Sequence, residues 1–344
     1  MRKLLNTLYV MSENTYISLE NENVIVSADD KILGRFPLHT LEQIVYFGYR
    51  GASPALMGAC AKFAINLSFY NFNTGRFLAR VCGETHGNVL LRKEQYRISD
   101  DLHRSCTIAR NFIAAKIFNS RSVLNRAKRD HPLSVDVAKI EEASYALFSA
   151  CKQVRKEENL DSLRGFEGDA ANVYFGLFDD LILQNKEYFK FSGRVKRPPT
   201  DAVNALLSFV YTILANDCAS ALEGVGLDAY VGFMHRDRPG RKSLALDLME
   251  ELRGVYADRF VLTLINNRIV TPKDFVQQES GAVKMTDDAR KMLLTQWQER
   301  KKDVITHPFL GEKIPWGLVP HIQALLLARY IRHDLDEYPA FMWN

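Results

Sequence analysis

The chain has 344 residues, of which 47% are hydrophobic and 25% are charged. This balance excludes a disordered or collagen-like protein and is typical of a globular protein with room for two domains of ordinary size. The formal net charge is only +4, so the distribution of charge along the chain is more informative than its total.

The cysteines and the apolar stretches indicate in which cellular compartment the protein works. The most apolar stretch, residues 205–215, has 11 residues, well short of the roughly 20 that a membrane span needs, and the N-terminus does not resemble a signal peptide. The five cysteines form no CxxC pair and no zinc-type spacing, which argues against disulfides and structural zinc: Cys60, Cys82, Cys106, Cys151 and Cys218. We therefore expect a cytoplasmic protein with no membrane segment.

Residues 1–86 have the pattern of a small β domain, which we expect to resemble a β-sandwich. Short runs rich in Val, Ile, Leu, Phe and Tyr alternate with polar or Gly-containing breaks, as hairpins require. One helix, Pro54–Lys62, interrupts the series. Strands are expected at residues 3–10, 15–19, 23–27, 31–37, 43–47, 66–70 and 76–81.

From residue 87 to residue 344 the periodicity is helical, which predicts a larger all-α domain and an α+β protein overall. Helices are expected at residues 101–128, 135–156, 162–183, 201–222, 243–258, 286–301 and 317–332. Two irregular segments interrupt them, the basic residues 186–200 and the Gly/Arg-rich residues 235–241. We expect the helical domain to carry catalysis and DNA binding, and the β domain to form a dimer.

Basic residues gather in three stretches. Residues 92–130 contain 10 basic and 4 acidic residues (net +6), residues 186–200 contain 5 and 1 (net +4), and residues 235–242 contain 4 and 1 (net +3). Such patches suit a polyphosphate ligand, although each alone is also consistent with a solvated helix face. The candidate DNA-binding residues are Arg92, Arg97, Arg194, Lys196, Arg197, Arg238, Arg241 and Lys242.

An acidic helix follows the third basic stretch. On a helix over residues 243–253, Asp247, Glu250 and Glu251 lie opposite the apolar face, which alone is consistent with a solvated acidic surface. However, Asp247 and Glu251 are like charges four residues apart, a mildly unfavourable pair that a divalent cation would relieve. Asp247 and Glu250 are three residues apart and can point into one site.

His235 and Glu167 are the other candidate site residues. His235 lies in a Gly/Pro/Arg turn just before the acidic helix, and an imidazole beside carboxylates suits Mn²⁺ or Mg²⁺; a lone histidine is otherwise more often structural. Glu167 lies between Gly165 and Gly168 near the start of a predicted helix. These glycines cost helix stability and indicate close approach of another helix or of a phosphate backbone.

Three sequence blocks in order resemble the CRISPR-associated spacer-acquisition integrase, a family also described as metal-dependent DNA endonucleases. The blocks are GFEGDAA (165–171), RPPTDAVNALLSFVYTIL (197–214) and VGFMHRDRPGRKSLALDLMEELR (231–253). The order of a β part followed by helices matches the family too, so the resemblance covers essentially the whole chain. Residues 87–97, GNVLLRKEQYR, look most like the type I-C branch.

The resemblance implies that Glu167, His235 and Glu250 ligate a catalytic Mn²⁺ or Mg²⁺, and that Asp247 is a further acidic residue of the catalytic site. Some members have Asp where this chain has Glu250, and Glu251 is the alternative to it. The resemblance also implies a homodimer, a small ferredoxin-like partner protein, and insertion of short DNA by attack of 3′-hydroxyl ends on the repeat. Two alternatives stay open at this point: a non-catalytic nucleic-acid scaffold and a metal-dependent RNase.

Overall fold

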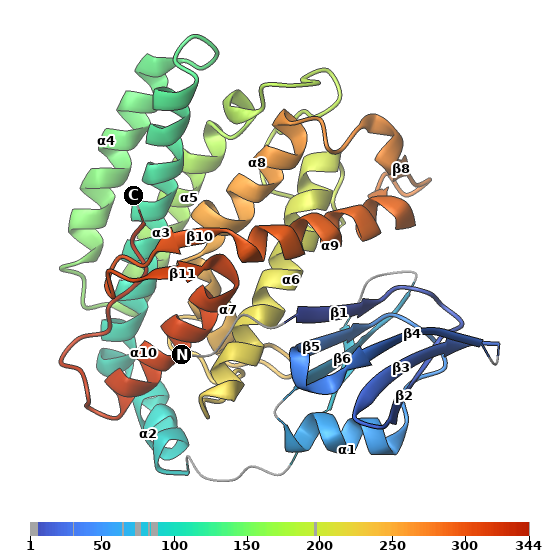
Figure 1. Cartoon of the computed structure of the whole chain (residues 1–344). Coiled ribbons are helices and arrows are strands. Elements are labelled where there is room, and N and C mark those ends of the chain that lie inside the picture. The colour runs from blue at the N-terminus through green and yellow to red at the C-terminus, as the bar shows by residue number, and fades with distance from the viewer. Residues whose placement is uncertain are drawn as a thin grey trace. The chain divides into compact units, whose positions relative to one another are not determined.

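The protein is described by a computed structural model over residues 6–29, 31–63, 65–72, 77–81, 83, 89–195 and 198–343. The chain divides into two compact units, Met1–Gly87 and Asn88–Asn344 (Figure 1). The first consists mainly of β-sheets and the second mainly of helices. The predicted α+β class is therefore confirmed, and each unit is described by itself below.

The first unit contains two sheets and one helix. A four-stranded sheet has the order β1-β5-β6-β7, and a three-stranded antiparallel sheet has the order β2-β3-β4. The elements are β1 (Asn6–Val10), β2 (Tyr16–Glu20), β3 (Asn23–Ala28), β4 (Lys31–Pro37), the 3₁₀ turn η1 (Leu38–Thr40), β5 (Leu41–Tyr46), α1 (Pro54–Lys62), β6 (Asn66–Tyr70) and β7 (Phe77–Arg80). The first residues of two predicted strands, 3–5 and 76, lie outside the described residues.

Antiparallel pairing joins β2, β3 and β4, as the polar breaks in the sequence predicted, but not every pair of neighbouring strands is antiparallel. β1 pairs with β5 in parallel, and β5 pairs with β6 in parallel. Parallel neighbours need a crossover connection, which α1 provides between β5 and β6. Buried apolar side chains fill the core of this unit, among them Ile17, Val24, Ile44, Leu56 and Leu67.

The second unit is mostly helical, but it is not all-α as expected. Two short antiparallel hairpins, β8-β9 and β10-β11, lie among its helices. Its elements are α2 (Val89–Asp100), α3 (Leu102–Asp130), α4 (Val137–Val154), α5 (Leu160–Gly176), η2 (Asp179–Leu181), α6 (Ala202–Gly224), α7 (Ser243–Glu250), η3 (Arg253–Asp258), α8 (Arg259–Asn266), η4 (Pro272–Asp274), β8 (Phe275–Gln277), β9 (Val283–Met285), α9 (Asp287–Lys302), β10 (Val304–Thr306), β11 (Lys313–Pro315), η5 (Trp316–Leu318) and α10 (Val319–Ile331).

Side-chain caps explain where several of these helices begin. Asp101 accepts from two backbone N–H groups at the start of α3, and Asp136, Asp201 and Thr286 each accept one at the starts of α4, α6 and α9. Such caps satisfy donors that have no partner inside the helix. The 29-residue helix α3 packs against α4 and α5 (Figure 1), and this packing brings α3 and α5 together at the site described below.

Helix α6 accounts for the apolar stretch seen in the sequence. Among the described helices it is the one long and apolar enough to cross a membrane, and 61% of its most apolar window is buried inside the structure. Val203, Leu206, Leu207, Val210 and Leu214 are fully buried in the core of the helical unit. This burial is typical of the core helix of a globular protein.

The predicted continuous helix over residues 243–258 is wrong. Helix α7 ends at Glu250, and residues Arg253–Asp258 form the π-helix η3. A π turn is wider than an α turn and is frequent at functional sites. Helix α7 ends between two neighbouring carboxylates, and these have different partners. Glu250 pairs with Lys116, whereas Glu251 accepts from the Tyr338 hydroxyl.

Candidate metal site of the helical unit

Asp247 organises the loop that carries His235. The carboxylate of Asp247 is fully buried and accepts the backbone N–H groups of Phe233 at 2.7 Å, Met234 at 3.0 Å and His235 at 3.0 Å. Three backbone donors aimed at one carboxylate satisfy its oxygens in a buried position. The conformation of the loop therefore depends on Asp247.

Gly232 allows the loop to approach α7 this closely. A Cβ atom at Gly232 would lie 2.8 Å from Cβ of Ser243 and 2.9 Å from Oδ2 of Asp247. Both distances are shorter than side chains tolerate, so this position requires glycine. Gly232 thus allows the loop to pack closely against helix α7.

The same carboxylate orients the imidazole of His235. Nδ1 of His235 lies 2.5 Å from Oδ1 of Asp247. A carboxylate at Nδ1 places the ring proton there and leaves the lone pair of Nε2 free for another partner, the usual arrangement of metal-binding histidines. The 18% exposed side chain of His235 is therefore held in a ligating orientation.

Two further helices anchor this loop, through residues that the sequence analysis missed. Arg164 of α5 donates through Nη2 to the carbonyl of Met234 at 2.7 Å. Gln95 of α2 is fully buried and donates to the carbonyls of Asp228 and Val231, both at 2.8 Å. The sequence carries no signal for these two contacts, because the burial of Gln95 depends on tertiary packing.

Glu167 of α5 and Glu250 of α7 meet at one cation, the ammonium of Lys116 on α3. Nζ of Lys116 contacts Oε1 of Glu167 and lies 2.8 Å from Oε2 of Glu250. Arg253 also donates through Nη1 to both oxygens of Glu250, at 2.8 and 3.0 Å. Two carboxylates that are far apart in the sequence are thus brought to a single point.

The positive charges around Glu250 keep its buried carboxylate ionised. Burial alone would raise the pKa of Glu250, but the charges of Arg253 and Lys116 outweigh burial and lower the pKa well below its usual range. Glu250 is 2% exposed, so it is an ionised carboxylate held inside the protein. Glu167 and Glu250 share Lys116, and His235 is held by Asp247, which lies on the same helix as Glu250. Glu167, Glu250 and His235 form the cluster described below.

This cluster has the donor set of a divalent metal site. Two carboxylates that share a cation, next to an imidazole with an oriented Nε2, suit Mn²⁺ or Mg²⁺. No three Asp, Glu, His or Cys side chains within the described residues already surround one point as metal ligands, and Lys116 supplies the shared positive charge. The oxygens of Asp247 are engaged by the loop, which suits a positioning role.

The interpretation of the acidic helix as a solvated surface is wrong. Asp247 and Glu251 are 0% exposed and Glu250 is 2% exposed, because α7 packs in the interior. Glu251 accepts from the Tyr338 hydroxyl at 2.5 Å and from the backbone N–H of Phe341 at 2.7 Å. Glu251 thus binds the C-terminal segment through Tyr338 and Phe341 and is not part of the cluster.

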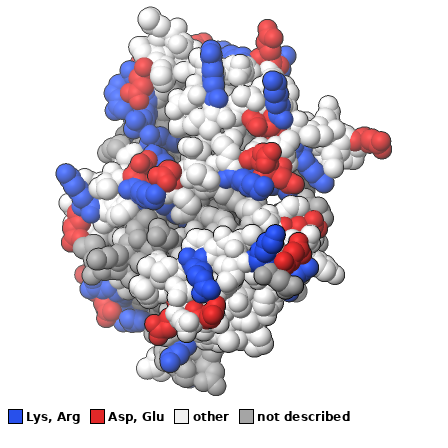
Figure 2. Space-filling view, turned by 45° about the vertical axis from the view of Figure 1, so that its right-hand side comes forward, with Lys and Arg blue, Asp and Glu red and all other residues white. Residues whose placement is uncertain are grey.

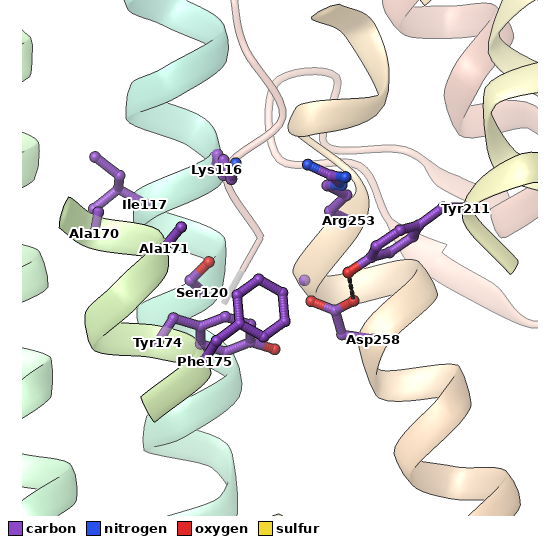
Figure 3. Close-up of a pocket in the computed structure, with 11 residues that line it drawn as sticks. Lys116, Ile117, Ser120, Ala170, Ala171, Tyr174, Phe175, Tyr211, Arg253 and Asp258 are labelled. Atoms are coloured by element: carbon purple, nitrogen blue, oxygen red, sulfur yellow. Dashed lines mark hydrogen bonds between the residues drawn. The ribbon is translucent and has the colours of Figure 1, made fainter. Parts of the chain in front are cut away.

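A small cavity adjoins the cluster on the side of η3 (Figure 3). Lys116, Tyr211, Arg253 and Asp258 line it, and its volume of about 10 Å³ is roughly the space of one water molecule. The Tyr211 hydroxyl donates to Oδ1 of Asp258 at 2.5 Å. Burial raises the pKa of Asp258 to about 6, although the Tyr211 hydroxyl and the Arg253 charge act in the opposite direction.

The glycines beside Glu167 do not pack against another helix, so that alternative is wrong. A Cβ atom at Gly165 or at Gly168 would meet no atom within 4 Å. Glu167 also lies in the middle of α5 rather than near its start. Both glycines face open space, which leaves room for a ligand at this surface.

Several predicted DNA-binding residues have structural partners within the protein. Arg194 donates to Oδ1 of Asn204 at 2.7 Å and to the Ser208 hydroxyl at 3.0 Å. Arg92 donates to the carbonyl of Gly226 at 3.1 Å. Lys242 donates to Oδ1 of Asn216 at 2.7 Å, and Arg97 pairs with Glu94 at 3.3 Å.

Arg238 and Arg241 are better placed to meet a ligand. Arg238 is exposed and Arg241 is half-buried, and both lie in the turn that follows His235. Lys196 and Arg197 lie outside the described residues. On the face shown in Figure 2, basic and acidic side chains are interspersed, and no large basic field is seen there among the described residues.

Comparison with known proteins identifies the family of the chain. The family model for CRISPR associated protein Cas1 matches residues 8–299. CRISPR-associated endonuclease Cas1 1 of Chlorobaculum tepidum is 48% identical over 344 residues, and Cas1 2 of Rhodospirillum rubrum is 49% identical over 348 residues, each over the full length of both chains.

Solved structures share the fold. A Cas1 protein from Thermotoga maritima superposes with a TM-score of 0.82 at 18% identity, over 97% of this chain and 99% of that one. A casposase bound to its integration product has a TM-score of 0.82 at 22% identity, over 97% and 92%. The family model and the full-length relatives show that the chain belongs to the CRISPR-associated Cas1 family.

Proposed function

We propose that the protein is the metal-dependent DNA endonuclease and integrase of CRISPR adaptation, which inserts short DNA fragments into the repeat array. One observation carries the proposal: Glu167 and Glu250 meet at a shared cation beside a His235 that Asp247 orients. Full-length relatives that are almost half identical are named endonucleases. This favours an enzyme over the scaffold alternative.

Glu167, His235 and Glu250 would hold Mn²⁺ or Mg²⁺. When bound, the ion acts as a Lewis acid that lowers the pKa of the attacking 3′-hydroxyl and stabilises charge on the leaving oxygen. The protein's own contribution is orientation. Asp247 holds the imidazole, and Arg253 holds both oxygens of Glu250, so that the ligands lose little freedom when the ion binds.

Double-stranded DNA, both the incoming fragment and the repeat, would lie over the turn after His235. Arg238 and Arg241 are in position to contact phosphates there, and the open surface at Gly165 and Gly168 gives the backbone of the DNA room to approach α5. Contacts of this kind position DNA without reading its sequence.

The first unit is suited to self-association. Residues 1–91 carry 8 basic and 7 acidic residues, and the edge strand β4 exposes Ile32 and Leu33, at 52% and 58%. An unpaired strand edge with apolar side chains is a ready surface for a second copy, and a symmetric pair is the commonest oligomer. We therefore propose a homodimer formed by this unit.

A small ferredoxin-like partner protein and a cytoplasmic location complete the proposal. A Cas6-RT-Cas1–Cas2 complex contains a chain that matches all of this chain at a TM-score of 0.82 and 22% identity, over 37% of its own length. Cys60, Cys106, Cys151 and Cys218 are buried and unpaired, which fits a reducing compartment. The type I-C branch stays a prediction.

The test is a strand-transfer reaction with a short duplex bearing 3′-hydroxyl ends and a repeat-containing DNA. We expect a chelator to abolish product and added Mn²⁺ or Mg²⁺ to restore it. A scaffold would bind DNA equally well in chelator and give no product in metal. Competing labelled DNA and RNA in one reaction separates the RNase alternative, which predicts preferential RNA cleavage.

A further inference from the structure

Lys116 is a buried lysine in the middle of an apolar helix segment. Its neighbours Ala114, Ala115 and Ile117 are at most 1% exposed, and Lys116 itself is 8% exposed. An ammonium ion in such a position is stable only when carboxylates compensate the loss of hydration. The carboxylates that the described structure places on its Nζ are those of Glu167 and Glu250.

The ammonium of Lys116 lies between the two carboxylates, where a metal ion shared by both would bind. Lys116 contacts both glutamates, whereas Arg253 pairs with only one of them, Glu250. The guanidinium of Arg253 also lies 4.5 Å from the ring centre of Tyr211. Arg253 is therefore held to one side by an aromatic ring. Lys116 carries a compact charge on a flexible stem, and of the two cations it alone lies between the carboxylates.

We propose that Lys116 is a built-in counter-ion that holds Glu167 and Glu250 together in the metal-free protein and that a divalent cation must displace. This rests on the proposed metal site. Without Lys116 the two carboxylates would repel each other, so the empty site would be less stable but more attractive to a cation. Lys116 thus has two effects: it keeps the metal-free site ordered, and it lowers the affinity of the site for a metal ion.

Competition for the two carboxylates predicts opposite effects for two substitutions. Lys116→Met removes the charge and keeps an unbranched apolar stem, so we expect Mn²⁺ to bind about tenfold tighter, within the usual range of coupling between two ligands. Lys116→Arg replaces the ammonium by a guanidinium that grips carboxylates bidentately, so Mn²⁺ should bind more weakly. Lys301→Met is the matched control, because Lys301 is also 8% exposed and pairs at 2.8 Å with Asp217, which is outside the cluster.

The experiment measures Mn²⁺ binding to the full chain by the electron paramagnetic resonance signal of free Mn²⁺, together with thermal unfolding with and without Mn²⁺. Metal-free Lys116→Met should unfold at a lower temperature than the wild type, and Mn²⁺ should narrow that gap. Lys301→Met should lose stability without any recovery by Mn²⁺ and should bind Mn²⁺ as the wild type does.

Mn²⁺ affinity of Lys116→Met equal to or below that of the wild type overturns the counter-ion role and leaves the metal site standing. A wild-type protein that binds no Mn²⁺ overturns the metal site itself, and the counter-ion role with it. If Lys116→Met does not fold without metal, Lys116→Arg decides: weaker binding supports the proposal, and equal or tighter binding overturns it.

Discussion

Oδ1 of Asp247 lies 2.5 Å from Nδ1 of His235, and the same carboxylate accepts three backbone N–H groups of the loop that carries this histidine. One buried acid thus sets both the conformation of the loop and the orientation of the imidazole. We therefore propose that Asp247 acts through His235, as a positioning residue of the catalytic site.

Replacing Asp247 by Asn should weaken the metal site without unfolding the protein. An amide cannot accept from all four donors, so the imidazole loses its fixed orientation and we expect Mn²⁺ affinity to fall roughly 10- to 100-fold, with a loss of about 1–3 kcal/mol in the free energy of unfolding. Mn²⁺ titration and denaturant unfolding measure the two effects. Asp237→Asn, an exposed acid of the same loop, is the control, and equal Mn²⁺ affinity in both variants would contradict the positioning role.

Replacing Arg238 and Arg241 together by Ala should weaken DNA binding and its salt dependence. Each phosphate contact on duplex DNA contributes about 0.9 to the slope of log affinity against log salt, so the slope should fall while Mn²⁺ affinity is kept. Arg194→Ala should instead lower the free energy of unfolding by roughly 1–3 kcal/mol and leave the slope unchanged, because Arg194 hydrogen-bonds within the protein. A double variant with the wild-type slope means that this turn does not touch phosphate.

Charges on the edge strand β4 should dissociate the dimer. Glutamates at Ile32 and Leu33 would bring like charges together across a symmetric interface, so the double variant should sediment as a monomer. Leu133→Glu places a charge at a fully exposed position of the helical unit, where Leu133 is 100% exposed, and should leave the dimer intact. A dimeric Ile32→Glu/Leu33→Glu variant would show that this edge is not the interface.

Asp258 should make stability depend on pH. Burial raises its pKa to about 6, above the usual value near 4, so its contribution to stability is complete at low pH and is lost as the pH rises through 6. Asp258→Asn keeps an acceptor for Tyr211 and removes the charge. Relative to the wild type it should gain roughly 1–1.5 kcal/mol between pH 5 and 7.5, and a similar amount between pH 3 and 5, measured by urea unfolding. A difference that does not vary with pH contradicts the raised pKa.

The sequence predicted the long helices and their starts because local chemistry determines them. Asp101, Asp136, Asp201 and Thr286 cap helices close to where they were expected. Helix α2 was missed because Leu91, Gln95 and Ile98 are its only buried positions, too few for a clear apolar stripe. The parallel pairing of β1, β5 and β6 was missed because it depends on tertiary contacts.

The contacts within the candidate metal site could not be predicted from the sequence. Lys116 was counted with the basic residues of the 92–130 stretch, since no local pattern marks a lysine as buried. The meeting of Glu167 with Glu250 depends on the packing of α3 against α5 and α7, which spacing does not reveal. The resemblance to a family, not periodicity, grouped these residues with His235, and their ligand roles stay predictions.

The most direct test of the account measures Mn²⁺ binding and strand transfer side by side in Glu167→Ala, His235→Ala and Glu250→Ala. A site with three protein ligands loses its metal when one ligand is removed. Circular dichroism and thermal unfolding in chelator establish that each variant is folded. We expect every folded variant to lose both Mn²⁺ binding and strand transfer; near wild-type strand transfer in Mn²⁺ by any one of them would show that the replaced residue is not a metal ligand.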